Sequence, residues 1–154
     1  MSDNKYYLRT LEDFNAGEIY KHYPHKTVTE SDNNLFCLLT LNHHPLHCDL
    51  EFAEKSKHGK ILVVGTYVIS LVVGMSVPDI SGAAIANLEY EKIVHNCPVF
   101  IGDTIRAESI ILEIKPSSNK PDRGVLYVET VAFNQNNKKV LTLRRRVLLP
   151  RKNK

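Results

Sequence analysis

The sequence lacks tryptophan, a long apolar run and any large excess of charge, and each absence excludes a class of protein. With no recognised motif and no aromatic residues among its arginines, the chain gives no indication of a nucleic-acid partner. The most apolar stretch, Val63–Val77, is interrupted by glycine and serine and is too short to cross a membrane. The first residues, Met1–Lys5, have no signal-peptide pattern. We therefore expect a cytoplasmic protein with neither a membrane nor a nucleic-acid partner.

Cysteine is also scarce, with residues only at positions 37, 48 and 97. Their number is odd, their spacing is wide and their contexts are largely apolar. We therefore expect reduced, buried thiols. No two of them have the close spacing of a zinc site, so the cysteines predict no metal.

The net charge of +3 is modest, but basic residues concentrate near the C-terminus. They are Arg144, Arg145, Arg146, Arg151, Lys152 and Lys154. Two interpretations stay open. The cluster could favour an anionic ligand such as a nucleotide phosphate or a CoA tail. Alternatively, it is a solvated strand edge and tail.

The length of 154 residues and the hydrophobic content of 43% suit one domain, 1–154, with a real core. Thr29 or Ser31 is placed to cap a helix. The apolar face of that helix is expected to contain Leu35, Phe36, Leu38 and Leu39. Leu50–Lys57 predicts a short helix, and Val63–Met75 predicts a long buried one.

Strand-like patterns dominate the rest of the chain. Strands are expected around residues 19–23 and at 84–90, 92–95, 104–115, 125–134 and 139–149. Lys115–Gly124 reads as a long hairpin loop, and Gln135–Lys138 as a turn in which Asn tolerates a positive φ. This order predicts an α+β fold, with an antiparallel sheet wrapped on one buried helix.

The helix predicted at Val63–Met75 is apolar on nearly every side. One face of a sheet cannot cover such a helix completely. A second copy of the chain could supply the missing cover, so we expect a homodimer or a higher homo-oligomer.

The stretch Thr40–Asp49 is the most informative part of the sequence. It contains His43, His44 and His47, and Pro45 makes it a turn between two helix-like runs. Such a turn can hold the polar groups that handle a proton and a water molecule. The three imidazoles could also bind Zn or Ni. No carboxylate or fourth histidine lies at a standard ligand spacing, so no metal is predicted.

Three segments resemble the MaoC-like dehydratases, the hotdog-fold family that includes the R-specific enoyl-CoA hydratases. The segments are Thr40–His47, Val64–Tyr67 and Pro98–Thr104, in the family's order and spacing. The resemblance implies a hotdog fold and a lyase that hydrates or dehydrates an enoyl-CoA thioester without a cofactor. A branch with Asn-Thr-Asn-Pro-Leu-His-Phe-Asp is most similar to Asn42–Asp49. That branch resembles hydratases of branched, dicarboxylic thioesters such as mesaconyl-CoA or itaconyl-CoA.

The resemblance also implies which residues are catalytic. His47 retains the family's histidine and is the expected acid or base. Asn42 stands where the family has a catalytic Asp, so it can orient water but cannot ionise. Gly65 follows Val64 where the family has His-Gly. Its N–H, at the start of a helix, is the expected donor to the thioester oxygen.

Three further residues are expected to contact the substrate. They are His44, which replaces the family's Asn, Thr66 and Tyr67. Asp49 is a candidate to orient His47, as a carboxylate does in a catalytic triad.

Arg145 shares one side of its predicted strand with apolar neighbours, so it needs a partner. That partner is either a substrate carboxylate or a local acid such as Glu129. His58 and His95 have the pattern of ordinary surface or strand residues.

Two other functions stay open besides the lyase. A hotdog thioesterase needs a carboxylate near the thioester, and Asn42 counts against it. A non-catalytic protein that binds acyl-CoA would be consistent with Asn42 but not with the retained His47 and Gly65.

Overall fold

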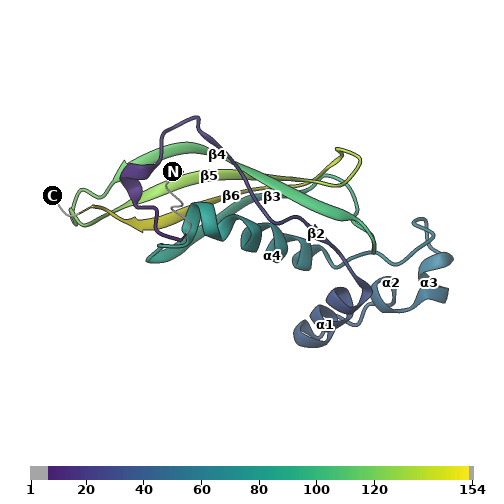
Figure 1. Ribbon diagram of the computed structural model, residues 1–154. Coiled ribbons are helices and arrows are strands. Elements are labelled where there is room, and N and C mark those ends of the chain that lie inside the picture. Colours follow the sequence, from purple (N-terminus) through teal and green to yellow (C-terminus); the bar gives the residue numbers. More distant parts are fainter. Residues whose placement is uncertain (1–6, 153–154) are drawn as a thin grey trace.

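The structure of the chain is a computed structural model that describes residues 7–152. The expectations for Met1–Lys5 and Lys154 lie outside the described residues. Figure 1 shows a long curved sheet with helix α4 along one face, and three short helices that stand away from the sheet at one end. Within residues 7–152, no helix is both long enough and apolar enough to cross a membrane.

All strands pair antiparallel, in the order β1-β4-β5-β6-β3, and β2 also pairs with β4. Their bounds are β1 Ile19–Lys21, β2 Lys26–Thr27, β3 Ala86–His95, β4 Thr104–Pro116, β5 Arg123–Phe133 and β6 Lys139–Pro150. Within the described residues, strand β3 therefore ends the sheet, and its outer edge is unpaired.

The helical elements precede β3 in the sequence. They are η1 Leu11–Asp13, α1 Glu30–Thr40, α2 Pro45–Cys48, α3 Leu50–Glu54, α4 Gly65–Ser76 and the π-helix η2 Val77–Ser81. The predicted α+β fold, with a sheet wrapped on one long helix, is confirmed. Helix α3 is shorter than the predicted Leu50–Lys57.

Helix α4 forms the main core with the sheet face that it covers. Its buried apolar residues are Val68, Val72 and Met75, which pack among residues such as Ile105, Ala132 and Leu143. The long buried helix was predicted correctly, but it is not apolar on every side. Thr66, Ser70 and Gly74, spaced one turn apart, form an exposed stripe.

Helix α1 begins as the sequence predicted, but its leucines face outward. Thr29 caps it, and Asp32 completes the capping box. The expected apolar face was wrong as a buried face, because Leu38 and Leu39 are 63% and 73% exposed. Asn33 and Cys37 are buried instead. Helix α1 lies away from the sheet, so the sheet does not cover its leucines (Figure 1). On its buried side, Asn33 forms hydrogen bonds with backbone groups of neighbouring segments.

The two strands expected at 84–90 and 92–95 are one strand, β3. Two register shifts along its pairing with β6 interrupt the alternation, and Lys92 has a φ of 55°. A bulge adds a residue to one strand without ending the pairing. The turn at Gln135–Lys138 is confirmed, and Asn137 has the positive φ that was expected of it. The long hairpin loop is also confirmed, although β4 and β5 extend into it as far as the Pro116–Gly124 pair.

Arg145 is fully buried, but the expected acidic partner is wrong, because Glu129 pairs with Arg144. The acceptors of the Arg145 guanidinium are all neutral: the hydroxyls of Ser76 and Ser81 and the amide oxygen of Asn87. Ser76 is the last residue of α4, and Ser81 is the last residue of η2, which follows it directly. Arg145 therefore ties β6 to the end of the core helix.

The other basic residues near the C-terminus that the structure describes also form local ion pairs. The carboxylates of Glu129, Glu89, Glu91, Glu12 and Asp13 pair with Arg144, Arg146, Arg151 and Lys152. This favours the solvated edge over a site for an anionic ligand.

Candidate functional site

The histidine-rich stretch forms a compact turn between α1 and α2. Leu41 ends α1 in the left-handed conformation, with a φ of 59°. The ring Nδ1 of His44 then caps α2 by accepting from the N–H of Leu46 at 3.2 Å, and Pro45 occupies the first turn, where no N–H is needed. Asn42 is half-buried, and its side-chain oxygen accepts from the backbone N–H of His44 at 3.4 Å.

His47 lies on α2 with its ring held in one orientation. Its Nδ1 is 2.6 Å from the carbonyl oxygen of Leu62. A carbonyl only accepts, so Nδ1 is the donor, and in the neutral ring Nε2 keeps its lone pair. The half-buried imidazole thus has Nδ1 fixed by the backbone, and within residues 7–152 its Nε2 makes no hydrogen bond. This is the arrangement that a general base needs.

Asn33 links the histidine turn to the start of α4. Its side-chain NH₂ donates to the carbonyl of His47 at 2.8 Å, and its oxygen accepts from the N–H of Val64 at 3.0 Å. The Asn33 side chain is completely buried, and its bond with Val64 is buried with it. Sequence reasoning missed Asn33 and Leu62. The burial of one Asn in a helix and the position of a backbone carbonyl leave no pattern in the sequence, so neither residue had a signal that could have found it.

The proposed orienting role of Asp49 is wrong in this structure. Its carboxylate accepts from the N–H of Phe52 at 3.0 Å and caps α3. The Leu62 carbonyl, and not Asp49, holds the His47 ring in its orientation. Asp49 follows a strong local preference, because an acidic side chain before a helix is placed to bond the first free N–H groups.

Gly65 is the first residue of α4, and no side chain caps this helix end. The N–H groups of a first helical turn have no acceptor within the helix and favour a negative charge. The Asn33–Val64 bond holds this end beside the histidine turn. The N-terminal end of α4, with Gly65 as its first residue, is therefore tied to the histidine turn through Asn33.

The expected substrate contacts differ in their surroundings. Tyr67 is half-buried, its ring lies 5.6 Å from that of Phe36, and burial raises the pKa of its phenol. Thr66 is exposed in the same helical turn. His44 is exposed, and its ring contacts that of His47 edge-on at 5.9 Å. Tyr67 thus contacts α1 through Phe36, and His44 lies beside His47 of α2.

The cysteines are free thiols. Cys37 is buried and Cys97 half-buried, whereas Cys48 is exposed on α2, contrary to the expectation of burial. Among residues 7–152, no group of three or more histidine, cysteine or acidic side chains is arranged to hold a metal.

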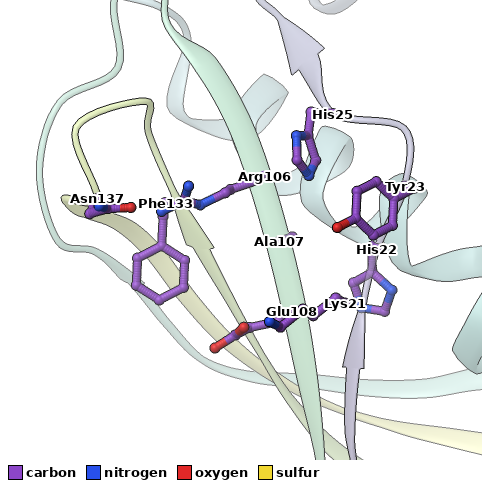
Figure 2. A pocket seen from close by; sticks show the side chains of 9 residues that line it. All are labelled: Lys21, His22, Tyr23, His25, Arg106, Ala107, Glu108, Phe133 and Asn137. Carbon is purple, nitrogen blue, oxygen red and sulfur yellow. The ribbon is translucent and has the colours of Figure 1, made fainter.

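A cavity of about 400 Å³ lies elsewhere, where the chain between β1 and β2 leaves the edge of the sheet. Figure 2 shows β4 running through it, with Tyr23 and His25 on one side and Phe133 and Asn137 on the other. None of the predicted site residues lines this cavity.

A buried polar cluster lies beneath that cavity. The His22 ring contacts the Asp79 carboxylate at 2.8 Å through Nδ1 and the Ser109 hydroxyl at 2.7 Å through Nε2. Ser109 in turn bonds Thr130 at 2.7 Å. The order of groups is that of a hydrolytic triad, but Ser109 is completely buried and cannot meet a substrate. The cluster joins β1, β4, β5 and η2.

Comparisons with known proteins agree with this geometry. Residues 13–132 match the family described as the MaoC like domain. The chain is 37% identical over 141 residues to the mesaconyl-CoA hydratase of Cereibacter sphaeroides, covering 92% of this chain and 41% of that protein.

Two solved structures have the same fold. A putative MaoC domain dehydratase from Chloroflexus aurantiacus superposes with a TM-score of 0.92 at 29% identity, over 99% of this chain and 43% of that one. A conserved hypothetical protein of Mycobacterium tuberculosis, which has a double hotdog fold, gives 0.87 at 18% identity, over 94% and 44%. The chain thus spans about two fifths of the length of each of these three relatives. It belongs to the MaoC-like dehydratase family and has the hotdog fold.

Proposed function

We propose that the chain is an enoyl-CoA hydratase or dehydratase, a lyase that adds or removes water across the double bond of the thioester. The observation that carries this proposal is the His47 ring, fixed through Nδ1 by the Leu62 carbonyl and free at Nε2. The relative named mesaconyl-CoA hydratase supports a branched, dicarboxylic acyl group. No cofactor takes part in the proposed reaction.

In the direction of hydration, His47 Nε2 takes a proton from water as the water oxygen bonds to C3. The C2–C3 π electrons move toward the thioester carbonyl, and its oxygen becomes the enolate oxygen. The Gly65 N–H stabilises that charge. The imidazolium of His47 then returns the proton to C2, so that one water has been added and the base is regenerated.

Asn42 orients the attacking water in this scheme. Its side-chain oxygen can accept from the water, and its NH₂ can donate to it. Because an amide does not ionise, both proton transfers fall to His47. His44, Thr66 and Tyr67 are proposed to line the acyl-thioester site.

We further propose that the active form is a homodimer built on the unpaired edge of β3. Apolar side chains are exposed along this strand, among them Leu88, Ile93 and Val94. The relatives that are more than twice as long, one of them a double hotdog, support a second hotdog at this edge. In this proposal the second copy also covers the exposed stripe of α4 and forms part of the wall of the active site.

The test is incubation with a panel of enoyl-CoA thioesters that includes mesaconyl-CoA, followed by mass spectrometry. A gain of one water identifies the hydratase. Release of free CoA would identify the thioesterase instead. Tight binding with no change of mass would identify a binding protein and contradict the lyase.

A further inference from the structure

His95, the last residue of β3, packs its ring on Gly65 at the start of α4. A methyl group added to Gly65 would lie 3.0 Å from both Cε1 and Nε2 of His95, and 3.7 Å from Nδ1. These two residues are thirty positions apart in the sequence, and the fold brings them into contact.

The position of the ring relative to the helix is the important point. In an α-helix each Cα–Cβ bond tilts toward the N-terminus, so the Cβ direction of Gly65 leads beyond the first turn of α4. The free N–H groups of that turn point toward the same end. The His95 ring and the Gly65 N–H therefore border one region, the region where the thioester oxygen is placed in the proposed reaction.

Glycine at this position is explained by the histidine. Gly65 does not have the positive φ that often requires glycine, and glycine is a poorer helix former than alanine. The 3.0 Å distances are tighter than ordinary contacts, so even alanine would force the His95 ring to move. A missing side chain at residue 65 thus permits an imidazole to approach the helix end.

The His95 ring is positioned but has free nitrogens. Pairing with β6 fixes its backbone, since His95 lies opposite Leu141 and the next residue, Asn96, donates to the Val140 carbonyl at 2.9 Å. Within residues 7–152, neither ring nitrogen of His95 makes a hydrogen bond. In His47, by contrast, Nδ1 is bonded to a carbonyl. The side chain is also exposed, so a ligand can reach it.

We propose that His95 is a second catalytic donor to the thioester oxygen, acting beside the Gly65 N–H. This role rests on the proposed lyase function. As water adds to C3, the carbonyl oxygen gains negative charge and accepts two hydrogen bonds, one from the Gly65 backbone and one from a His95 ring N–H. No proton is transferred by His95, and His47 remains the acid and base.

The test compares His95→Ala and His95→Gln with wild type, using His58→Ala as the matched control. His58 is a partly exposed histidine whose ring packs on that of Phe100. Removal of one such donor usually lowers kcat by about 10²–10³-fold. We expect that loss in His95→Ala, with KM nearly unchanged and the thermal midpoint retained. His95→Gln keeps an N–H donor and should recover part of kcat.

A second variant tests the contact itself. Gly65→Ala should lower kcat by displacing the ring, and the loss should be much smaller when Gly65→Ala is made in the His95→Ala background, because no ring remains to be displaced. Wild-type activity retained in His95→Ala would overturn the role of His95 and leave the lyase standing. A wild type inactive on every thioester would overturn both.

Discussion

The Nδ1 of His47 donates to the carbonyl oxygen of Leu62 across 2.6 Å. This bond sets which nitrogen of the ring is available for chemistry, and its acceptor is a backbone carbonyl, so no substitution of the Leu62 side chain removes it directly. The site can therefore be tested by changing the ring without changing its support.

His47→Ala should lower hydratase turnover by about 10²–10⁴-fold, the usual contribution of a general acid–base group. The ring is only half-buried, so the thermal midpoint should change little. Steady-state kinetics and thermal unfolding check the two parts. His44→Ala, which alters the exposed neighbouring histidine, serves as the control and should be less severe. Near-normal turnover in His47→Ala would place the chemistry elsewhere.

Asn33→Ala should reduce both stability and activity, because it leaves the Val64 N–H and the His47 carbonyl without their partner. An unsatisfied buried polar group costs about 1–3 kcal/mol in the free energy of unfolding. Chemical denaturation measures the first effect, and kcat the second. Asn34→Ala, at the exposed neighbouring position, should be close to neutral. Equal effects of the two substitutions would contradict the bridging role of Asn33.

Asn42→Asp should move the pH optimum of hydration upward. A carboxylate on the same turn stabilises the protonated imidazole of His47, so the neutral base is reached only at higher pH. Asn42→Ala should be less severe than His47→Ala and should leave the optimum in place. The pH profile of kcat/KM gives the answer. Hydratase activity that appeared only in Asn42→Asp would show that the natural chain is a binding protein.

Stability should fall as the pH is lowered below about 6.5, the ordinary pKa of histidine. Burial lowers the pKa of the His22 imidazole, although Asp79 opposes this shift. Between the lowered value and 6.5 the unfolded chain binds a proton that the folded chain does not, so acid favours unfolding. Thermal midpoints measured from pH 8 to pH 5 should show the loss. His22→Gln should have a lower thermal midpoint than wild type at pH 8, and its midpoint should fall less between pH 8 and pH 5 because residue 22 no longer titrates. If the midpoints of wild type and His22→Gln fall equally with pH, other groups cause the pH dependence.

Leu88→Arg should dissociate the proposed dimer. Leu88 is 51% exposed on β3, and a charge on each of two paired edges would be repelled and desolvated. Ile19→Arg is the matched control, since Ile19 is 57% exposed on β1, at the opposite end of the sheet. Sedimentation at micromolar concentration should give a dimer for the control and a monomer for Leu88→Arg. A wild type that is already monomeric would refute the dimer.

The elements that follow local rules were predictable from the sequence. The alternation of apolar residues predicted β4, β5 and β6. Thr29 and Asp32 predicted the start of α1, and Asn136 and Asn137 predicted the turn between β5 and β6. These features depend on side chains within a few residues of one another. The family resemblance added His47 and Gly65 as expected catalytic residues.

The features that the sequence did not predict depend on contacts between distant segments. The Leu62 carbonyl has no side-chain signature, and the ring of His95 reaches Gly65 only because β3 runs back along α4. The outward leucines of α1 reflect where that helix stands in the fold, which its own amphipathic pattern cannot specify.

The buried cluster of His22 determines how the N-terminal segment lies on the sheet. Successive residues of a strand face opposite sides, so sliding β1 by one residue along β4 would turn Lys21 or Tyr23 inward and His22 out. Neither replacement could satisfy the Asp79 carboxylate and the Ser109 hydroxyl in the same way. A short edge strand of apolar residues alone could settle in several alignments. The cluster therefore selects a single alignment, and so fixes the path by which the chain reaches α1 and the histidine turn.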